Sequence, residues 1–340
     1  MSHVQTVLGP VSAEELGGVL PHEHLLSLVP GPWLSGGRSG GRPDAIRIAV
    51  DALAPLKDAG VDTIVDLSPY GVVGRSATGS NVLALRELSE RTGLHVVAGS
   101  SVYLEAMSPA WVRDLDADGL AERFISDATT GFGDTGVRAG IFGEQATGLG
   151  VVTDFEEKNL RAAARAARAT GLAIATHTTH GTMVREQIAI LTDENTDLSR
   201  VVIGHLDIPE SPDDVLYALN AGANVAIDTI GKQHWDFFLG AEPVRADGEY
   251  TKRAYFRSDV SRAARVADLV AAGWADRLFL AMDLTGAEAY LNPLTHGQWG
   301  YSYLSAVFLP LLRDHGVTET DIATMTHVNP RRLLTVGGTR

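Results

Sequence analysis

The chain has 340 residues, of which 45% are hydrophobic, and its formal net charge is −14 at pH 7. This length allows one large core, and the acidic balance argues against nucleic-acid binding, which needs a basic surface. Because the chain contains no cysteine, disulfides, thiolate metal sites and cysteine nucleophiles are excluded, and any transition metal needs histidine and carboxylate ligands.

Eight short apolar segments rich in valine and isoleucine predict β-strands. They cover residues 18–26, 62–68, 95–102, 138–146, 172–178, 200–206, 224–230 and 277–284. Helical patterns separate them, most clearly at 44–60, 154–171 and 261–273. The second of these has acidic residues in its first turn and ends at Gly171, which is typical of a helix start and stop.

The alternation of strands and helices predicts a parallel sheet, because parallel neighbours need a crossover element. Nearly continuous apolar strands indicate burial on both faces. Eight such units in a chain of 340 residues predict a single α/β domain, residues 1–340, folded as a (β/α)₈ TIM barrel. The alternative, an open doubly wound sheet for a dinucleotide, would be favoured by GxGxxG after the first strand, and that motif is absent.

Two connections are unusually long, namely residues 231–259 after the seventh strand and 285–305 after the eighth. Connections of this length are usually functional, and barrel enzymes keep their active sites on this side of the strands. We assign His180 and His234 to loops and expect them at the surface.

The N-terminal residues show neither the basic nor the apolar region of a secretory signal, and the apolar runs are too short for a membrane span. We therefore expect a cytoplasmic protein that acts on a small molecule and has neither a membrane nor a nucleic acid as its partner.

Histidines and carboxylates stand at or near the carboxyl ends of five predicted strands. They are His22, His24, Glu144, His177, His205 and Asp283. In a barrel these ends meet at one mouth, where four imidazoles and two carboxylates can hold two divalent metals. Each residue alone has a structural alternative.

A buried histidine with ordinary hydrogen bonds would account for His177 or His205. A buried ion pair with an arginine would account for Glu144 or Asp283 as well as a metal does. Asp66 and Asp228 also lie in apolar strands and raise the same question. The joint pattern across separate strands, rather than any one of these residues, favours a metal centre.

The ordered motifs LPHEHLL, AGIFGE, ATHT, IGHLD, AIDTIGK, AMDLT and VNPRRLL resemble the phosphotriesterase family of the amidohydrolase superfamily nearly end to end. The resemblance implies a (β/α)₈ barrel, commonly a homodimer, with a binuclear metal centre. It implies two divalent metal ions, commonly zinc, with Mn²⁺, Co²⁺ or Fe²⁺ as alternatives. Family members hydrolyse phosphotriesters, lactones, or carboxyl esters and amides.

Carried over by residue, His22, His24 and Asp283 would hold the more buried metal, and His177 and His205 the more exposed one. Many relatives bridge the metals with a carboxylated lysine. This chain resembles instead the glutamate-bridged, lactonase-like subgroup, with Glu144 as the bridge.

The resemblance also implies a mechanism and a set of substrate contacts. A hydroxide between the metals would attack the substrate, and Asp283 would carry the proton to the leaving group. Tyr103 resembles a tyrosine near the metals of lactonase-type relatives and would donate to a substrate oxygen, unless it only packs at the barrel rim.

The long seventh connection supplies further candidates for substrate contact. Lys232 and Arg253, together with Arg245, Lys252 and Arg257, would meet an anionic substrate group, although a solvated loop also explains each charge. Trp235, with Phe237 and Phe238, would cap the pocket or bury the loop.

We expect hydrolysis of a small lactone or carboxylic ester. An N-acyl amide, or a phosphoester or phosphotriester, is the alternative substrate at the same centre. A binding protein that has lost catalysis is the alternative from another functional class.

Overall fold

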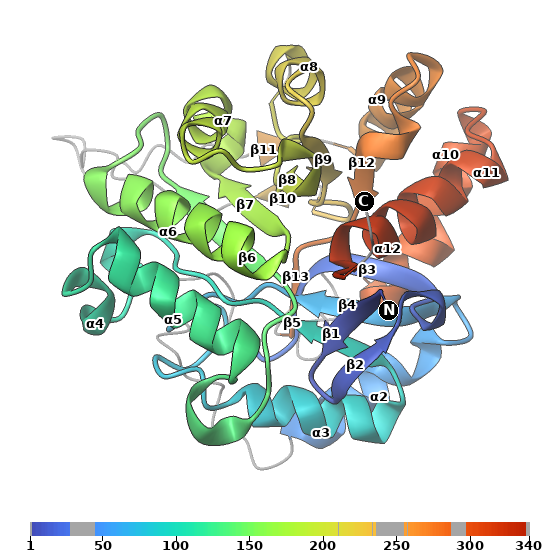
Figure 1. Ribbon diagram of the computed structural model, residues 1–340. Coiled ribbons are helices and arrows are strands. Elements are labelled where there is room, and N and C mark those ends of the chain that lie inside the picture. The colour runs from blue at the N-terminus through green and yellow to red at the C-terminus, as the bar shows by residue number, and fades with distance from the viewer. Residues whose placement is uncertain are drawn as a thin grey trace, which may run out of the picture.

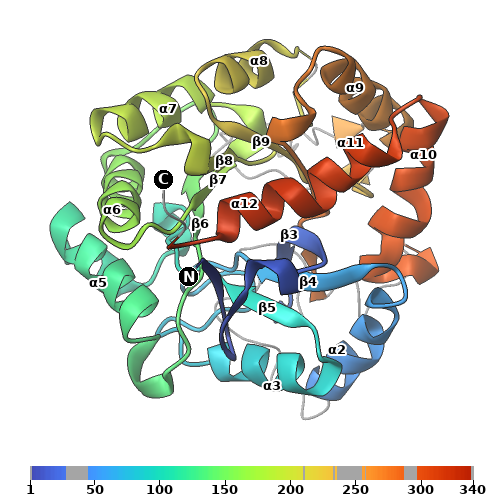
Figure 2. The ribbon, with the colours of Figure 1, turned by 45° about the vertical axis from the view of Figure 1, so that its right-hand side comes forward.

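The computed structural model describes residues 2–27, 45–209, 211–232, 234–235, 255–256, 258–286 and 297–337. Its strands lie at the centre and its helices form the outer layer around them (Figures 1 and 2). This arrangement confirms the α/β class and the alternation predicted from the sequence.

All eight predicted strands are present, and most are shorter at one or both ends than predicted. They are β3 (Gly18–His24), β4 (Val61–Asp66), β5 (His95–Ala98), β6 (Phe142–Thr147), β7 (Ile174–Thr178), β8 (Val201–Ile203), β9 (Asn224–Ile227) and β12 (Leu278–Leu280). A short strand that the sequence did not predict, β13 (Leu284–Thr285), follows β12. The strands form two parallel sheets in the orders β12-β9-β8-β7-β6 and β13-β3-β4-β5.

Backbone contacts join the two sheets at both edges. Between β5 and β6, Gly99 pairs with Ile141 in parallel, and the amide of Ser100 donates to the carbonyl of Ile141 over 3.0 Å. At the other edge the amide of Asp283, which lies between β12 and β13, donates to the carbonyl of His22 on β3 over 3.1 Å. These contacts bring the edges of the two sheets together, an arrangement in keeping with the predicted (β/α)₈ barrel.

The outer layer contains α2 (Ala45–Leu53), α3 (Val82–Thr92), α4 (Ala110–Arg113), α5 (Ala117–Thr129), α6 (Asp154–Thr170), α7 (Val184–Asp193), α8 (Asp213–Asn220), α9 (Asp259–Ala271), α10 (Leu309–Asp314) and α11 (Glu319–Ala323). Helix α6 matches its prediction because Thr153 and Glu156 form a capping box at its start. The predicted helix 44–60 stops being α-helical at Leu53, and a 3₁₀ turn containing Pro55 follows.

The amino-terminal end of the barrel is covered by elements that the sequence did not predict. A hairpin, β1 (His3–Thr6) with β2 (Gly9–Ser12), and helix α12 (Asn329–Leu334) meet there through a bridge between His3 and Val336. Figure 2 shows α12 lying across this end of the ring. Val4 and Leu333 pack with apolar side chains of the barrel interior, such as Phe279.

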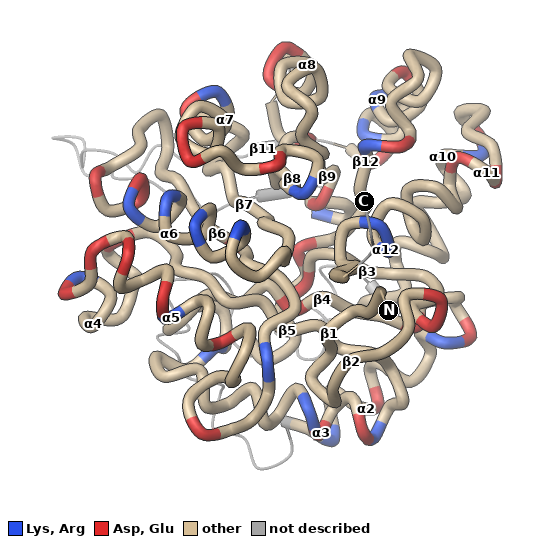
Figure 3. The backbone as a smooth tube through the Cα atoms, viewed as in Figure 1, with Lys and Arg blue, Asp and Glu red and all other residues tan. Residues whose placement is uncertain are grey.

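Acidic and basic residues are spread along the outer helices (Figure 3). Within the described residues, no helix has the length and apolar character needed to cross a bilayer. Most of the two long connections lies outside the described residues, so their predicted roles in the site stay predictions.

Candidate metal centre

The six side chains predicted to bind metal lie together at the carboxyl ends of the strands. His22 and His24 end β3 and, as alternate residues of a strand, point to the same side. Glu144 and His177 lie on β6 and β7, whereas His205 follows β8 and Asp283 follows β12. All are buried, apart from Asp283, whose side chain is 14% exposed.

One group of possible ligands consists of His22, His24 and Asp283, whose ligand atoms lie within 4.8 Å of one another. Nε2 of His24 is 2.9 Å from Oδ1 of Asp283, and Nε2 of His22 is 3.7 Å from the same oxygen. A second group consists of Glu144, His177 and His205, with the same limit on separation. Nε2 of His205 is 2.8 Å from Nδ1 of His177.

Glu144 lies between the two groups. Its Oε1 is 3.5 Å from Nε2 of His24, and its Oε2 is 3.1 Å from Nδ1 of His177 and 3.6 Å from Nε2 of His205. Oε2 is also 3.5 Å from Nε2 of His22. Oε1 thus faces the first group, and Oε2 lies between the first group and the second, so this carboxylate adjoins both groups as a bridging ligand must.

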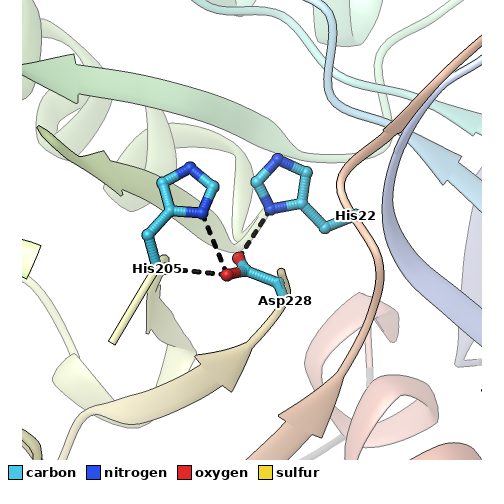
Figure 4. A group of neighbouring side chains, drawn as sticks. All are labelled: His22, His205 and Asp228. Atoms are coloured by element: carbon cyan, nitrogen blue, oxygen red, sulfur yellow. Dashed lines mark hydrogen bonds and ion pairs between the residues drawn. The ribbon is translucent and has the colours of Figure 1, made fainter. Parts of the chain in front are cut away.

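Asp228 connects the two histidine groups from below (Figure 4). Its Oδ2 accepts from Nδ1 of His22 over 2.8 Å, and its Oδ1 accepts from Nδ1 and the backbone amide of His205 over 3.0 and 2.8 Å. A carboxylate bonded to Nδ1 fixes the proton there and leaves Nε2 to bind a metal. The sequence flagged Asp228 as a buried carboxylate but assigned it no role.

The donor atoms fit a divalent cation. Nε2 of His22 is buried and has no hydrogen-bond partner within the described part of the chain, although it faces Glu144 and Asp283. An unpaired buried polar atom is costly, and a cation would satisfy it. Imidazole nitrogens and carboxylate oxygens suit Zn²⁺, Mn²⁺, Co²⁺ and Fe²⁺.

The carboxylates of the site shift the pKa values of the imidazoles beside them. Burial alone would lower the pKa of His205, but the charge and hydrogen bond of Asp228 raise it to about 10. Burial would also lower the pKa of His22, but its hydrogen bond to Asp228 and the charges of Asp228 and Glu144 raise it well above its usual value. Burial and the nearby charge of His205 lower the pKa of His177.

The same contacts keep the carboxylates ionised. Burial would raise the pKa of Asp228, but the charges and hydrogen bonds of His205 and His22 hold it well below its usual range. Burial likewise opposes ionisation of Asp283, yet the charge of Lys232 and the hydrogen bond from His24 keep its pKa low. The site therefore presents anionic oxygens to a cation.

Asp66, the other buried aspartate of uncertain role, is held by an arginine. Its Oδ1 accepts from Nη2 of Arg75 over 2.8 Å, and its Oδ2 accepts from the amide of Leu25 over the same distance. The next turn places Ser68, whose hydroxyl is 3.1 Å from Nδ1 of His24. Asp66 thus supports the strand ends that carry His24 and Ser68, through an ion pair rather than a metal.

Two predicted substrate residues border the ligand groups. The hydroxyl of Tyr103 is 3.2 Å from Nε2 of His177, and its ring stands edge-on to that imidazole. Lys232 is only 8% exposed and its Nζ lies 2.6 Å from Oδ2 of Asp283. Lys232 is therefore a buried group of the site, whereas the sequence alone favoured a solvated loop.

Other predictions about this region are wrong or lie outside the described residues. His180 is buried rather than at the surface, because it forms a tight turn directly after β7. His234 and Trp235 form a short strand, β10 (His234–Trp235), paired with β11 (Tyr255–Phe256), so His234 is not in a loop. The remaining candidates of the seventh connection lie outside the described residues, namely Arg245, Lys252, Arg253, Arg257, Phe237 and Phe238.

Comparison with curated proteins finds relatives that span the chain. It is 31% identical over 322 residues to the phosphotriesterase homology protein of Escherichia coli (strain K12), covering 94% of this chain and 98% of that protein. It is 26% identical over 329 residues to the aryldialkylphosphatase of Saccharolobus solfataricus, covering 95% and 96%. It is 27% identical over 293 residues to the N-acetyltaurine hydrolase of Dictyostelium discoideum, covering 86% and 74%.

Solved structures show the same fold. A mutant organophosphorus hydrolase from Deinococcus radiodurans matches with a TM-score of 0.80 and 31% identity, covering 97% of both chains. A structure described as "Molecular Engineering of Organophosphate Hydrolysis Activity from a Weak Promiscuous Lactonase Template" matches with a TM-score of 0.78 and 30% identity, covering 98% of this chain and 99% of the other. A profile of the Phosphotriesterase family matches residues 2–334, so this chain belongs to the phosphotriesterase family.

Proposed function

We propose that this protein is a hydrolase that uses two divalent metal ions to open a small lactone or cleave a carboxylic ester. One ion would be held by His22, His24 and Asp283, and the other by His177 and His205. The observation that carries the proposal is the position of Glu144, whose carboxylate lies between the two histidine groups and within 3.5 Å of a histidine nitrogen in each. We assign Glu144 as the ligand shared by both ions.

Two metal ions at such a site supply a water molecule of lowered pKa and polarise the oxygen of the bond to be cleaved. The protein's own groups provide the proton transfer. Asp283 is the most exposed of the six proposed ligands, and its low pKa keeps it ionised, so that it can take up the proton lost by the attacking water and release it readily to the leaving group. Lys232, beside it, stabilises the ionised form of this carboxylate.

Three features support a lactone or ester as the substrate. By the resemblance, Glu144 stands where many relatives carry a carboxylated lysine, and this difference argues against efficient organophosphate hydrolysis. The hydroxyl of Tyr103 adjoins His177, from where it can donate to a substrate oxygen. A structural neighbour of 30% identity derives from a template that its description names a lactonase.

One observation favours a second candidate, an N-acyl amide whose amine part carries an anion. The ammonium group of Lys232 is buried at the edge of the site, where it would pair with a carboxylate or sulfonate. Relatives of this chain include N-acetyltaurine hydrolases. Zinc as the native metal and the homodimer are proposals that rest on the resemblance alone, and the cytoplasmic location stays an expectation from the sequence.

The test combines metal analysis, a substrate panel and one variant. We expect the purified protein to bind two equivalents of zinc and to hydrolyse lactones faster than N-acyl amino acids and paraoxon-like triesters. We expect Glu144→Ala to lose metal and activity together. The matched control is Glu156→Ala, because Glu156 is equally buried but caps α6 away from the site. Full metal binding in Glu144→Ala would refute the bridging role, and turnover of triesters alone would refute the choice of substrate.

A further inference from the structure

Glu23, between the two histidines of β3, points away from them because adjacent residues of a strand face opposite sides. Its side chain is fully buried. Oε1 accepts from the backbone amide of Met282 over 3.1 Å, and Oε2 accepts from the amide of Leu284 over 2.7 Å. One carboxylate therefore captures the two amides on either side of Asp283.

Asp283 itself has an unusual backbone. Its φ is +49°, a left-handed conformation that non-glycine residues rarely adopt. Its own amide donates to the carbonyl of His22 over 3.1 Å. Three consecutive amides, those of Met282, Asp283 and Leu284, are thus all bonded to β3, where the chain leaves β12 and joins β13.

These contacts determine where the Asp283 side chain points. With its backbone held at three positions, Asp283 directs Oδ1 to within 2.9 Å of Nε2 of His24 and Oδ2 to Lys232. Removing Glu23 would leave the buried amides of Met282 and Leu284 without their acceptor. Asp283, whose backbone conformation is strained, would then lose the hydrogen bonds that hold the residues on either side of it.

We propose that Glu23 is a positioning residue for Asp283 and hence for the metal site formed by His22, His24 and Asp283. This inference rests on the proposed function. It assigns a role to Glu23, the central residue of the HEH motif. Glu23 would not bind the metal itself but would hold Asp283, which does. Within the described part of the chain, Glu23 forms no hydrogen bond or ion pair with His177 or His205, so its influence on the second metal site is small.

The test is a zinc titration against a competing chelator for the wild-type protein, Glu23→Gln and Glu23→Asp. Glutamine keeps one oxygen acceptor, and aspartate keeps both but is shorter by about one carbon–carbon bond, roughly 1.5 Å. We expect one of the two zinc ions to bind at least about tenfold more weakly in Glu23→Gln than in the wild-type protein, and more weakly still in Glu23→Asp. The other ion is expected to bind within about twofold of wild type.

A matched control variant and two double variants test whether the effect is specific to Glu23 and which zinc site it concerns. Glu156 also accepts from two backbone amides, those of Gly148 and Thr153, so Glu156→Gln is a matched control that leaves both zinc affinities unchanged. In a His205→Asn background, Glu23→Gln should weaken the remaining zinc ion. In a His24→Asn background, Glu23→Gln should leave the remaining ion unaffected.

Equal weakening of both ions by Glu23→Gln, or no weakening of either, would overturn the positioning role. If neither variant folds, amide hydrogen exchange of the zinc-loaded wild-type protein tests the inference instead. The amides of Met282 and Leu284 are expected to exchange slowly, because both donate to the buried carboxylate of Glu23. Fast exchange of these amides would overturn the inference. A wild-type protein that binds no zinc would refute the proposed function instead, which separates the two failures.

Discussion

Replacing Asp228 with asparagine is expected to weaken both metal sites at once. Asp228 is fully buried, and its two oxygens accept from Nδ1 of His22 and from Nδ1 of His205. Asparagine offers one oxygen acceptor and one NH₂ donor, so it cannot accept from both imidazoles. At least one proposed ligand would then lose its orienting acceptor, and the other would exchange a charged acceptor for a neutral one.

The magnitude follows from the two hydrogen bonds. A hydrogen bond to a charged group contributes about 1.5–3 kcal/mol net, and about 1.4 kcal/mol corresponds to a factor of ten in affinity. We therefore expect each zinc ion to bind roughly 10- to 100-fold more weakly in Asp228→Asn, which agrees with the effect of removing carboxylates behind metal-bound histidines.

The assay is a chelator competition with zinc for the wild-type protein and Asp228→Asn. Because Asp228 also strengthens proton binding by His22 and His205, affinities are compared over a range from about pH 6 to about pH 9. Asp127→Asn is the control, since Asp127 is a buried carboxylate bonded to Tyr70, Ser100 and Arg123, apart from the ligand groups. If Asp228→Asn binds both ions within about threefold of wild type at every pH, our account of this residue is wrong.

Two further predictions concern protons and stability. Zinc binding should release protons and strengthen as pH rises, because the raised pKa values of His22 and His205 keep them protonated at neutral pH and a metal needs their neutral forms. Calorimetry in buffers of different ionisation enthalpy measures this release, and a pH-independent affinity without release would contradict it. Asp66→Asn should destabilise the metal-free protein by about 3–5 kcal/mol, since it leaves the buried Arg75 without its charged partner. Denaturant unfolding measures this loss, and a change below about 1 kcal/mol would show that the ion pair contributes little.

Much of the site could be predicted because the relevant signals are local. The alternation of His22 and His24 along a strand, and the position of His177 at a strand end, place these side chains at the barrel mouth once the strands are parallel. The caps of α6 are equally local, since Thr153, Glu156 and Gly171 act within one turn of the helix ends. Such features need no knowledge of distant residues.

The features that were not predicted depend on contacts between distant segments. The role of Asp228 requires β3 and β8 to place His22 and His205 on either side of it, and nothing in the AIDTIG segment indicates both partners. The hydrogen bonds of Glu23 join β3 to the amides of Met282 and Leu284, which lie 259 and 261 positions later in the chain. The hairpin of β1 and β2 is missed because its strands are only four residues each.

The charge at the barrel mouth explains why a metal centre fits these residues better than a network of hydrogen bonds alone. Glu144 and Asp228 are buried carboxylates and Asp283 is largely buried, and burying a carboxylate without a partner costs several kcal/mol. Without metal, protons on His22 and His205 and the ammonium group of Lys232 provide the compensating charge. Divalent cations can replace those protons while leaving the imidazoles neutral, so the site exchanges one form of positive charge for another. This exchange is the physical reason that metal binding and proton release must change together.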